Sequence, residues 1–289
     1  MDKLSNIGTI RDVLNRHGFQ FSKSLGQNFL INPTVCPRIA EEGGAGPGTG
    51  VIEIGTGIGV LTAELAKRAD KVVAVEIDSR LMPVLAETLA DYHNIKIIND
   101  DVLKVDLHRL IREEFGGMDV AVCANLPYYI TSPIIMGLLE ARLPIKSITV
   151  MVQKEAAIRI CAQPGTREAG AVSLAVRYFS TPKLLFHVSR GSFLPAPNVD
   201  SCVIRLDVRE QTPENVRDEM FFFRLVRAAF SQRRKTLVNP VASVLAVSKE
   251  SVKAALEQLG IRQTARAEEL TLEEFIALSN LLTEAKSHA

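Results

Sequence analysis

The sequence predicts an α/β protein with a mostly parallel, helix-covered sheet and a small all-α domain at its C-terminal end. Short apolar runs alternate with helical patterns from Val51 to about residue 161. The first run ends in three glycines, Gly55, Gly57 and Gly59, and about the last eighty residues carry only helical patterns. Alternation of this kind is typical of parallel strands joined by helical crossovers, with ligands at the carboxyl ends of the strands.

The apolar spacing predicts the elements of the large domain in order. An amphipathic pattern followed by a glycine predicts a helix over 7–17. The expected strands are 51–54, 72–76, 95–98, 119–124, 147–152, 183–188 and 202–208. The expected helices are 59–68, 80–91, 106–115, 133–140, 154–161 and 171–179.

The chain length favours two domains, since 289 residues exceed the usual size of one. We place the large domain at 1–208 and a basic helical domain at 209–289. Helical patterns in the second domain begin at Met220, cover 248–259, and resume at a capping box formed by Thr271 and Glu274.

The glycine loop predicts a nucleotide-like ligand, because glycines let a ligand lie against backbone N–H groups at a helix N-terminus. The dinucleotide fingerprint would need a glycine at position 60, where the chain has Val60. Glu76 ends the next apolar run, about 20 residues past the loop, where a carboxylate can accept hydrogen bonds from ribose hydroxyls. The alternative is a helix-capping turn in an ordinary βα unit.

This arrangement resembles motifs one and two of the class I S-adenosylmethionine-dependent methyltransferases. The segment Asn125-Leu126-Pro127-Tyr128 resembles the motif of amino-methyltransferases that act on adenine or cytosine. The resemblance implies a Rossmann-like domain, S-adenosyl-L-methionine as cofactor with S-adenosylhomocysteine as product, and no metal. It also implies that the cofactor contacts Gly55, Gly57, Glu76 and Asn125.

The reaction explains the residue types of the second motif. An exocyclic amine conjugated to a ring is a poor nucleophile and must point its lone pair at the sulfonium methyl group. The Asn125 side-chain oxygen and the Leu126 carbonyl can accept its two hydrogens. Pro127 biases Leu126 away from helical dihedral angles, and Tyr128 offers a ring face to the base. A simple turn between strand and helix is the alternative.

Further segments resemble the ribosomal RNA adenine dimethylases. Lys23-x-x-Gly-Gln-Asn-Phe-Leu30 resembles their N-terminal motif, although its composition alone predicts a surface loop. The resemblance implies that Asn28 and Leu30 close over the cofactor and that Asp101 contacts it, whereas spacing alone makes Asp101 a turn residue. The segment Phe193 to Ser201 resembles motif eight, in which Phe193 stacks on the extruded base opposite Tyr128.

A basic run in the C-terminal domain predicts RNA binding. The stretch 221–249 contains no acidic residue. A solvated helix face is one interpretation, but beside an adenine-modifying domain such charges can contact phosphates. The predicted RNA-binding residues are Arg224, Arg227, Arg233, Arg234 and Lys235.

The resemblance covers essentially the whole chain and is closest to the KsgA branch, partly through Ala229 to Leu237. It implies dimethylation of two adjacent adenosines in the 3′-terminal hairpin of 16S rRNA, within precursors of the small (30S) ribosomal subunit. The alternatives are an Erm-type enzyme acting on large-subunit rRNA and an assembly factor in which methylation is secondary. Leu126, where Erm proteins usually have Ile, favours the KsgA branch.

Composition excludes several classes of protein. No apolar stretch is long enough to span a bilayer, and the first twenty residues lack a signal-peptide core. The four cysteines form no C-x-x-C pair, which argues against a metal site or a disulfide framework. We therefore expect a cytoplasmic protein with buried free thiols, and nothing in the sequence demands more than a monomer.

Overall fold

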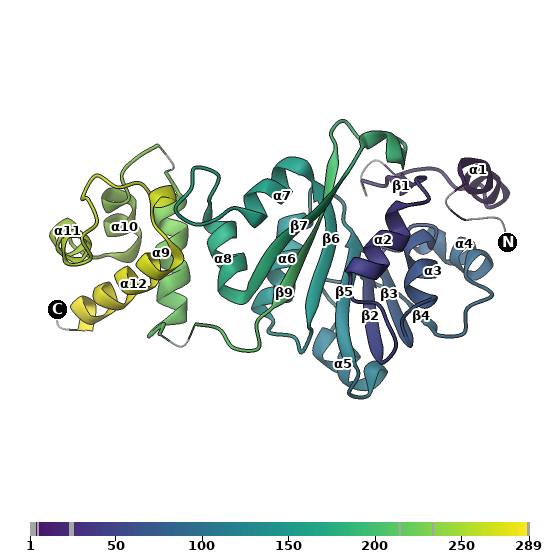
Figure 1. The fold of residues 1–289 in the computed structure, drawn as a ribbon, viewed down its shortest axis with the longest axis horizontal. Coiled ribbons are helices and arrows are strands. Elements are labelled where there is room, and N and C mark those ends of the chain that lie inside the picture. Colours follow the sequence, from purple (N-terminus) through teal and green to yellow (C-terminus); the bar gives the residue numbers. More distant parts are fainter. Residues whose placement is uncertain (1–3, 5, 23–25, 214, 233, 288–289) are drawn as a thin grey trace. The chain divides into compact units, whose positions relative to one another are not determined.

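The computed structural model describes residues 4, 6–22, 26–213, 215–232 and 234–287 (Figure 1). These residues form two compact units, Met1–Ala157 with Pro182–Val208, and Ile158–Thr181 with Arg209–Ala289. The described helices are α1 (Ile7–Arg16), α2 (Val35–Glu42), α3 (Val60–Ala66), α4 (Met82–Thr88), α5 (Leu107–Phe115), α6 (Thr131–Glu140), α7 (Lys154–Cys161), α8 (Ala171–Phe179), α9 (Glu219–Phe230), α10 (Val238–Leu245), α11 (Lys249–Gln258) and α12 (Leu272–Ser287). The described strands are β1 (Phe29–Leu30), β2 (Thr49–Ile54), β3 (Lys71–Glu76), β4 (Ile95–Asn99), β5 (Asp119–Asn125), β6 (Ser147–Gln153), β7 (Ser180–Val188), β8 (Phe193–Leu194) and β9 (Ser201–Val208).

The main sheet has, within the described part of the chain, seven strands in the order β4-β3-β2-β5-β6-β9-β7. The first five run parallel, and β9 runs antiparallel to β6. The predicted mostly parallel sheet is therefore confirmed, and the expected strands and helices agree with the observed ones to within a few residues. The strand order reverses at β2, the position at which doubly wound sheets bind ligands.

The central strands are apolar on both faces because both faces are covered. Val72, Val73, Ala74 and Val75 of β3 are at most 2% exposed. Such near-continuous apolar runs are typical of buried parallel strands.

A separate two-stranded sheet joins distant parts of the first unit. β1 pairs with β8 antiparallel, with Leu30 opposite Phe193. The sequence predicts only a loop for 23–30, because two residues are too few for an alternating pattern. This pairing brings the N-terminal segment beside the one that follows β7.

The second unit combines two stretches of the chain. One begins at Arg209, directly after β9, and the other, 158–181, groups with the C-terminal helices. Aromatic packing explains the grouping: the Tyr178 ring stacks on Phe222 at 5.3 Å and the Phe179 ring on Phe223 at 5.5 Å.

The predicted helices of the second unit are present, with one additional break. The helical pattern from Met220 divides into α9 and α10, and Pro240 lies in the first turn of α10, where its missing N–H costs nothing. The capping box at the start of α12 is confirmed, since Glu274 N–H donates to Thr271 Oγ1 and Thr271 N–H donates to the Glu274 carboxylate. None of the described helices is long and apolar enough to cross a membrane.

Candidate active site

A cavity of about 150 Å³ lies at the carboxyl ends of the parallel strands of the first unit. Its walls come from the segments after β2, β3, β4 and β5 and from the segments around β1 and β8. The lining includes all the residues predicted for cofactor and base: Asn28, Leu30, Gly55, Gly57, Glu76, Asp101, Asn125, Leu126, Pro127, Tyr128 and Phe193. The fold thus brings together motifs spread over more than half of the sequence.

The glycine loop forms one wall and needs glycine for its backbone. Gly55, Gly57 and Gly59 have φ values of 78°, 56° and 88°, which side-chain-bearing residues rarely adopt. A Cβ atom added at Gly57 would lie 3.2 Å from the Phe29 ring. The loop leads directly into α3, so its backbone and the helix N-terminus face the same cavity.

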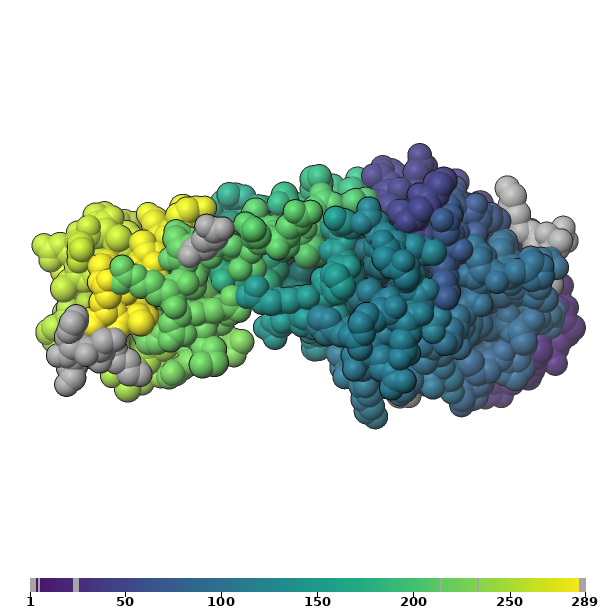
Figure 2. Space-filling view, turned by 90° about the horizontal axis from the view of Figure 1, so that it is seen from below, coloured from purple at the N-terminus to yellow at the C-terminus, as the bar shows by residue number. Residues whose placement is uncertain are grey.

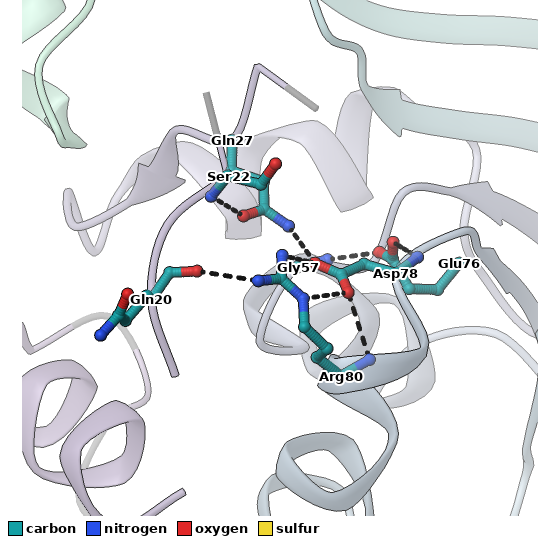
Figure 3. A network of polar contacts seen from close by, with 7 residues as sticks. All are labelled: Gln20, Ser22, Gln27, Gly57, Glu76, Asp78 and Arg80. Carbon is teal, nitrogen blue, oxygen red and sulfur yellow. Dashed lines mark hydrogen bonds and ion pairs between the residues drawn. The ribbon is translucent and has the colours of Figure 1, made fainter. Parts of the chain in front are cut away.

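Glu76 ends β3 with a buried, fixed carboxylate. One oxygen accepts hydrogen bonds from Thr56 Oγ1 at 3.0 Å and from the Gly57 N–H at 3.1 Å. The other accepts from the Asp78 N–H at 2.8 Å (Figure 3). These bonds attach the glycine loop to the end of the neighbouring strand.

Asn125 and Leu126 present acceptors to the cavity. The Asn125 amide nitrogen donates to the Asn28 carbonyl at 3.4 Å, which orients the side chain. Within the described residues, neither the Asn125 side-chain oxygen nor the Leu126 carbonyl has a hydrogen-bond donor. The Tyr128 hydroxyl is hydrogen-bonded to Ser201 Oγ at 2.8 Å, and burial raises the pKa of this phenol.

The N-terminal motif and motif eight lie next to each other through the β1–β8 pairing. Leu30 and Phe193 are 4% and 3% exposed, and both contribute to the cavity wall. The Asn28 amide donates to the Gly26 carbonyl at 3.0 Å. Lys23, the first residue of the predicted N-terminal motif, lies outside the described residues.

Asp101 lies in a turn at the edge of the cavity. Its carboxylate accepts a hydrogen bond from the Leu103 N–H at 3.1 Å, as a turn residue would. It also lines the cavity together with Asp100 and Val102.

Comparison with known proteins identifies the family. Residues 18–284 match the family described as ribosomal RNA adenine dimethylase. The chain is 52% identical to the "Ribosomal RNA small subunit methyltransferase A" of Geobacillus sp. (strain WCH70), with 95% of this chain and 96% of the relative covered. It is 47% identical to the protein of the same name from Alkaliphilus oremlandii (strain OhILAs), with 98% and 99% covered. The chain belongs to the ribosomal RNA adenine dimethylase family.

Solved structures agree with this assignment. A dimethyladenosine transferase from Plasmodium falciparum superimposes with a TM-score of 0.73 at 28% identity, covering 90% of this chain and 98% of that one. The 23S rRNA methyltransferase ErmE superimposes with a TM-score of 0.68 at 28% identity, covering 89% and 100%. The predicted enzyme class, a ribosomal RNA adenine dimethyltransferase, is confirmed, as is the resemblance to the branch of small-subunit methyltransferases.

Glu53 is a pocket residue of this dimethylase to which the sequence assigns no role. It lies within β2, is fully buried, and neither carboxyl oxygen has a hydrogen-bond partner in the described part of the chain. Burial raises its pKa to about 8, with the Thr62 hydroxyl opposing the rise and the nearby Glu76 carboxylate adding to it. An acid within an otherwise apolar run is the sequence signal that marks it.

Two exposed apolar side chains of the dimethylase also lie at the cavity. Ile77, directly after Glu76, is 56% exposed, and Tyr129, directly after Tyr128, is 64% exposed. Large apolar groups exposed beside a pocket are typical of a binding surface. Their positions next to recognised motifs are the only signal the sequence gives.

The predicted RNA-binding residues of the dimethylase belong to the second unit, and none of those described lines the cavity. Arg224 and Arg227 project from α9, while Arg234 and Lys235 lie in the turn before α10, and all four side chains are exposed. Figure 2 shows the residues of this unit that follow β9 in green to yellow. Arg233 lies outside the described residues.

The cysteine, histidine and acidic side chains of the dimethylase are the residues that could bind a metal ion. No disulfide joins the four cysteines, all of which the structure describes; Cys36, Cys123 and Cys202 are buried and Cys161 is half-buried. A search restricted to the described residues finds no group of three or more His, Cys, Asp or Glu side chains that could hold a metal ion.

Proposed function

We propose that this chain uses S-adenosyl-L-methionine to dimethylate the exocyclic amines of two adjacent adenosines in the 3′-terminal hairpin of 16S rRNA. One observation carries the proposal. The Asn125 to Tyr128 segment, with its free acceptors, lines the same cavity as the glycine loop and Glu76. An acceptor site for an amine and a nucleotide-type cradle thus share one pocket.

The cavity fits a positively charged, nucleoside-bearing cofactor. Glu53 supplies a buried carboxyl group without a partner among the described residues, and pairing with a cation favours its ionised form. Beside the glycine loop the space is open, since a Cβ atom added at Gly55 would have only the Asn125 carbonyl oxygen near it, at 3.9 Å. We assign cofactor binding to Asn28, Leu30, Gly55, Gly57, Glu76, Asp101 and Asn125. When bound, the cofactor supplies a methyl group on a sulfonium centre.

The residues at the end of β5 orient the target amine. Asn125 Oδ1 and the Leu126 carbonyl accept its two hydrogens, which directs the nitrogen lone pair away from both acceptors. Pro127 keeps the Leu126 carbonyl out of α6, and Tyr128 and Phe193 grip the extruded base. No strong general base is required, since the amine becomes acidic only as the new C–N bond forms.

The names of the relatives and the basic side chains of the second unit both support ribosomal RNA as the partner. The curated relatives are named for the small ribosomal subunit. Arg224, Arg227, Arg233, Arg234 and Lys235 offer sequence-independent phosphate contacts. The proposal places the enzyme in the cytoplasm as a monomer acting on 30S precursors, and four cysteines without a disulfide suit a reducing compartment.

The test is methyl transfer from labelled S-adenosylmethionine to small ribosomal subunits that lack the dimethyladenosine pair. Large subunits serve as the substrate control. We expect label on two adjacent small-subunit adenosines, abolished by Asn125→Ala and retained by Asn15→Ala, which changes an exposed asparagine of α1. Label on large subunits would instead indicate an ErmE-like activity, and tight small-subunit binding without transfer would indicate an assembly factor.

A further inference from the structure

Asp78 is a buried carboxylate next to the cavity that neither motif explains. It follows Glu76 by two residues, is 5% exposed, and does not itself line the cavity. Its two oxygens accept hydrogen bonds from Arg80 Nε at 2.8 Å and Arg80 Nη2 at 2.6 Å, and from Gln27 Nε2 at 2.7 Å. Asp78 therefore joins the segment after β3 to the N-terminal segment (Figure 3).

Gln27 connects this carboxylate to the cavity wall. Its amide nitrogen donates to Asp78, while its amide oxygen accepts from the Ser22 N–H at 2.9 Å. Gln27 lines the cavity, as do Gly26 and Asn28 on either side of it. Both ends of the Gln27 amide are thus fixed, and the orientation of the wall depends on Asp78 as its acceptor.

Arg80 strengthens the same connection from the side that faces solvent. Its Nη1 donates to the Gln20 carbonyl at 3.3 Å, and its guanidinium lies 5.1 Å from the centre of the Phe19 ring. The Phe19 ring contacts Phe29, which lies against Gly57. The N-terminal segment is therefore held at the Gln27 amide and at the Phe19 ring.

The charge of Asp78 is maintained at neutral pH. Its hydrogen bonds from Arg80, and then from Gln27, hold the pKa of the carboxyl group below its ordinary value. Charge-assisted hydrogen bonds of this kind are about twice as strong as neutral ones. An Asp78→Asn substitution keeps the shape but removes the charge that both donors share.

We propose that Asp78 is a positioning residue that holds the Gly26–Leu30 wall against the bound cofactor and thereby slows cofactor release. The ligand's identity rests on the proposed function, but the connection from Asp78 through Gln27 to the cavity wall stands on geometry. Asp78 contacts no reacting atom. It acts through Gln27 on Asn28 and Leu30, and through its N–H on the Glu76 carboxylate.

The experiment measures S-adenosylhomocysteine binding to the full chain by calorimetry and its release by stopped flow. For Asp78→Asn we expect Kd and the release rate to rise together by about 10-fold, as expected for loss of a charge-assisted bond. Gln27→Ala should give a similar increase, and the double variant should add little to either, because both remove one connection. At saturating cofactor, kcat should change less than 2-fold, roughly the precision of such a comparison.

The matched control is Asp207→Asn, which also removes an Asp paired with an Arg but lies in β9, opposite Ser147 at the start of β6. Wild-type release kinetics in Asp78→Asn, or additive effects of the two substitutions, would overturn the proposal. If Asp78→Asn does not fold, the same binding and release measurements on Gln27→Ala still test the proposal. Failure of the wild-type protein to bind S-adenosylhomocysteine would contradict the proposed function instead.

Discussion

The cavity of the first unit and the basic surface of the second use side chains in opposite ways. At the cavity, Glu53, Glu76 and Phe193 are at most 5% exposed and are held by strands and loops. In the second unit, the predicted RNA contacts that the structure describes are exposed charges on the amphipathic helix α9 and in the turn before α10. A buried site depends on exact geometry, whereas an exposed charged surface depends on the number of charges, so substitutions in the two regions should have different consequences.

The largest expected effect tests the geometric dependence of the cavity. Asn125→Ala should lower kcat for methyl transfer by about 100-fold or more, the scale seen when one preorganised hydrogen-bonding group is removed. Cofactor Kd should change by less than about 10-fold, because a single neutral hydrogen bond contributes about 1 kcal/mol. Single-turnover kinetics and calorimetry measure the two quantities. Equal losses in both would show that Asn125 holds the cofactor rather than the amine.

A stability experiment addresses the cost of the buried acid. Because the pKa of Glu53 is raised to about 8 from an ordinary value of 4.5, the folded state retains a proton that the unfolded state loses. Stability contributed by this proton declines as pH rises from about 4.5 to about 8. Glu53→Gln should therefore stabilise the cofactor-free protein by about 3 kcal/mol more at pH 8 than at pH 5.5.

Denaturant unfolding at the two pH values measures this difference, with Glu113→Gln, an exposed acid paired with Arg109, as control. Glu53→Gln should also weaken cofactor binding, because it removes the carboxyl group that can ionise and pair with the positively charged cofactor. A pH-independent gain in stability would mean that Glu53 is ionised in the fold.

The smallest expected effect tests the charge dependence of the second unit. Arg224→Gln with Arg227→Gln should weaken RNA binding several-fold at moderate salt and reduce the slope of log K against log salt by about 1.5, at roughly 0.7 to 0.9 per phosphate contact. Filter binding over a salt series measures the slope. The matched pair Lys249→Gln with Lys253→Gln, exposed cations of α11, should leave it nearly unchanged. Equal slopes for both pairs would indicate nonspecific attraction by the whole unit.

Local patterns in the sequence were sufficient for the elements and the motif positions. Apolar runs predict β2 to β6 because buried parallel strands must be apolar on both faces. Gly55, Gly57 and Gly59 have positive φ angles, which other residues rarely adopt. The three glycines in the sequence therefore mark the loop by themselves. The capping box of α12 is equally local, because its partners lie three residues apart.

The sequence alone thus determined the mostly parallel sheet, the glycine loop, the Asn125 to Tyr128 segment and the family to which the chain belongs. Only the tertiary structure decided that Leu30 lies opposite Phe193, that 158–181 groups with the C-terminal helices, that Glu53 has no partner among the described residues, and that Asp78 receives Gln27. The physical reason is distance along the chain. A pattern of burial or backbone conformation is recorded in neighbouring residues, but a pairing between residues 51 positions apart, as in Gln27 and Asp78, exists only after the sheet has assembled.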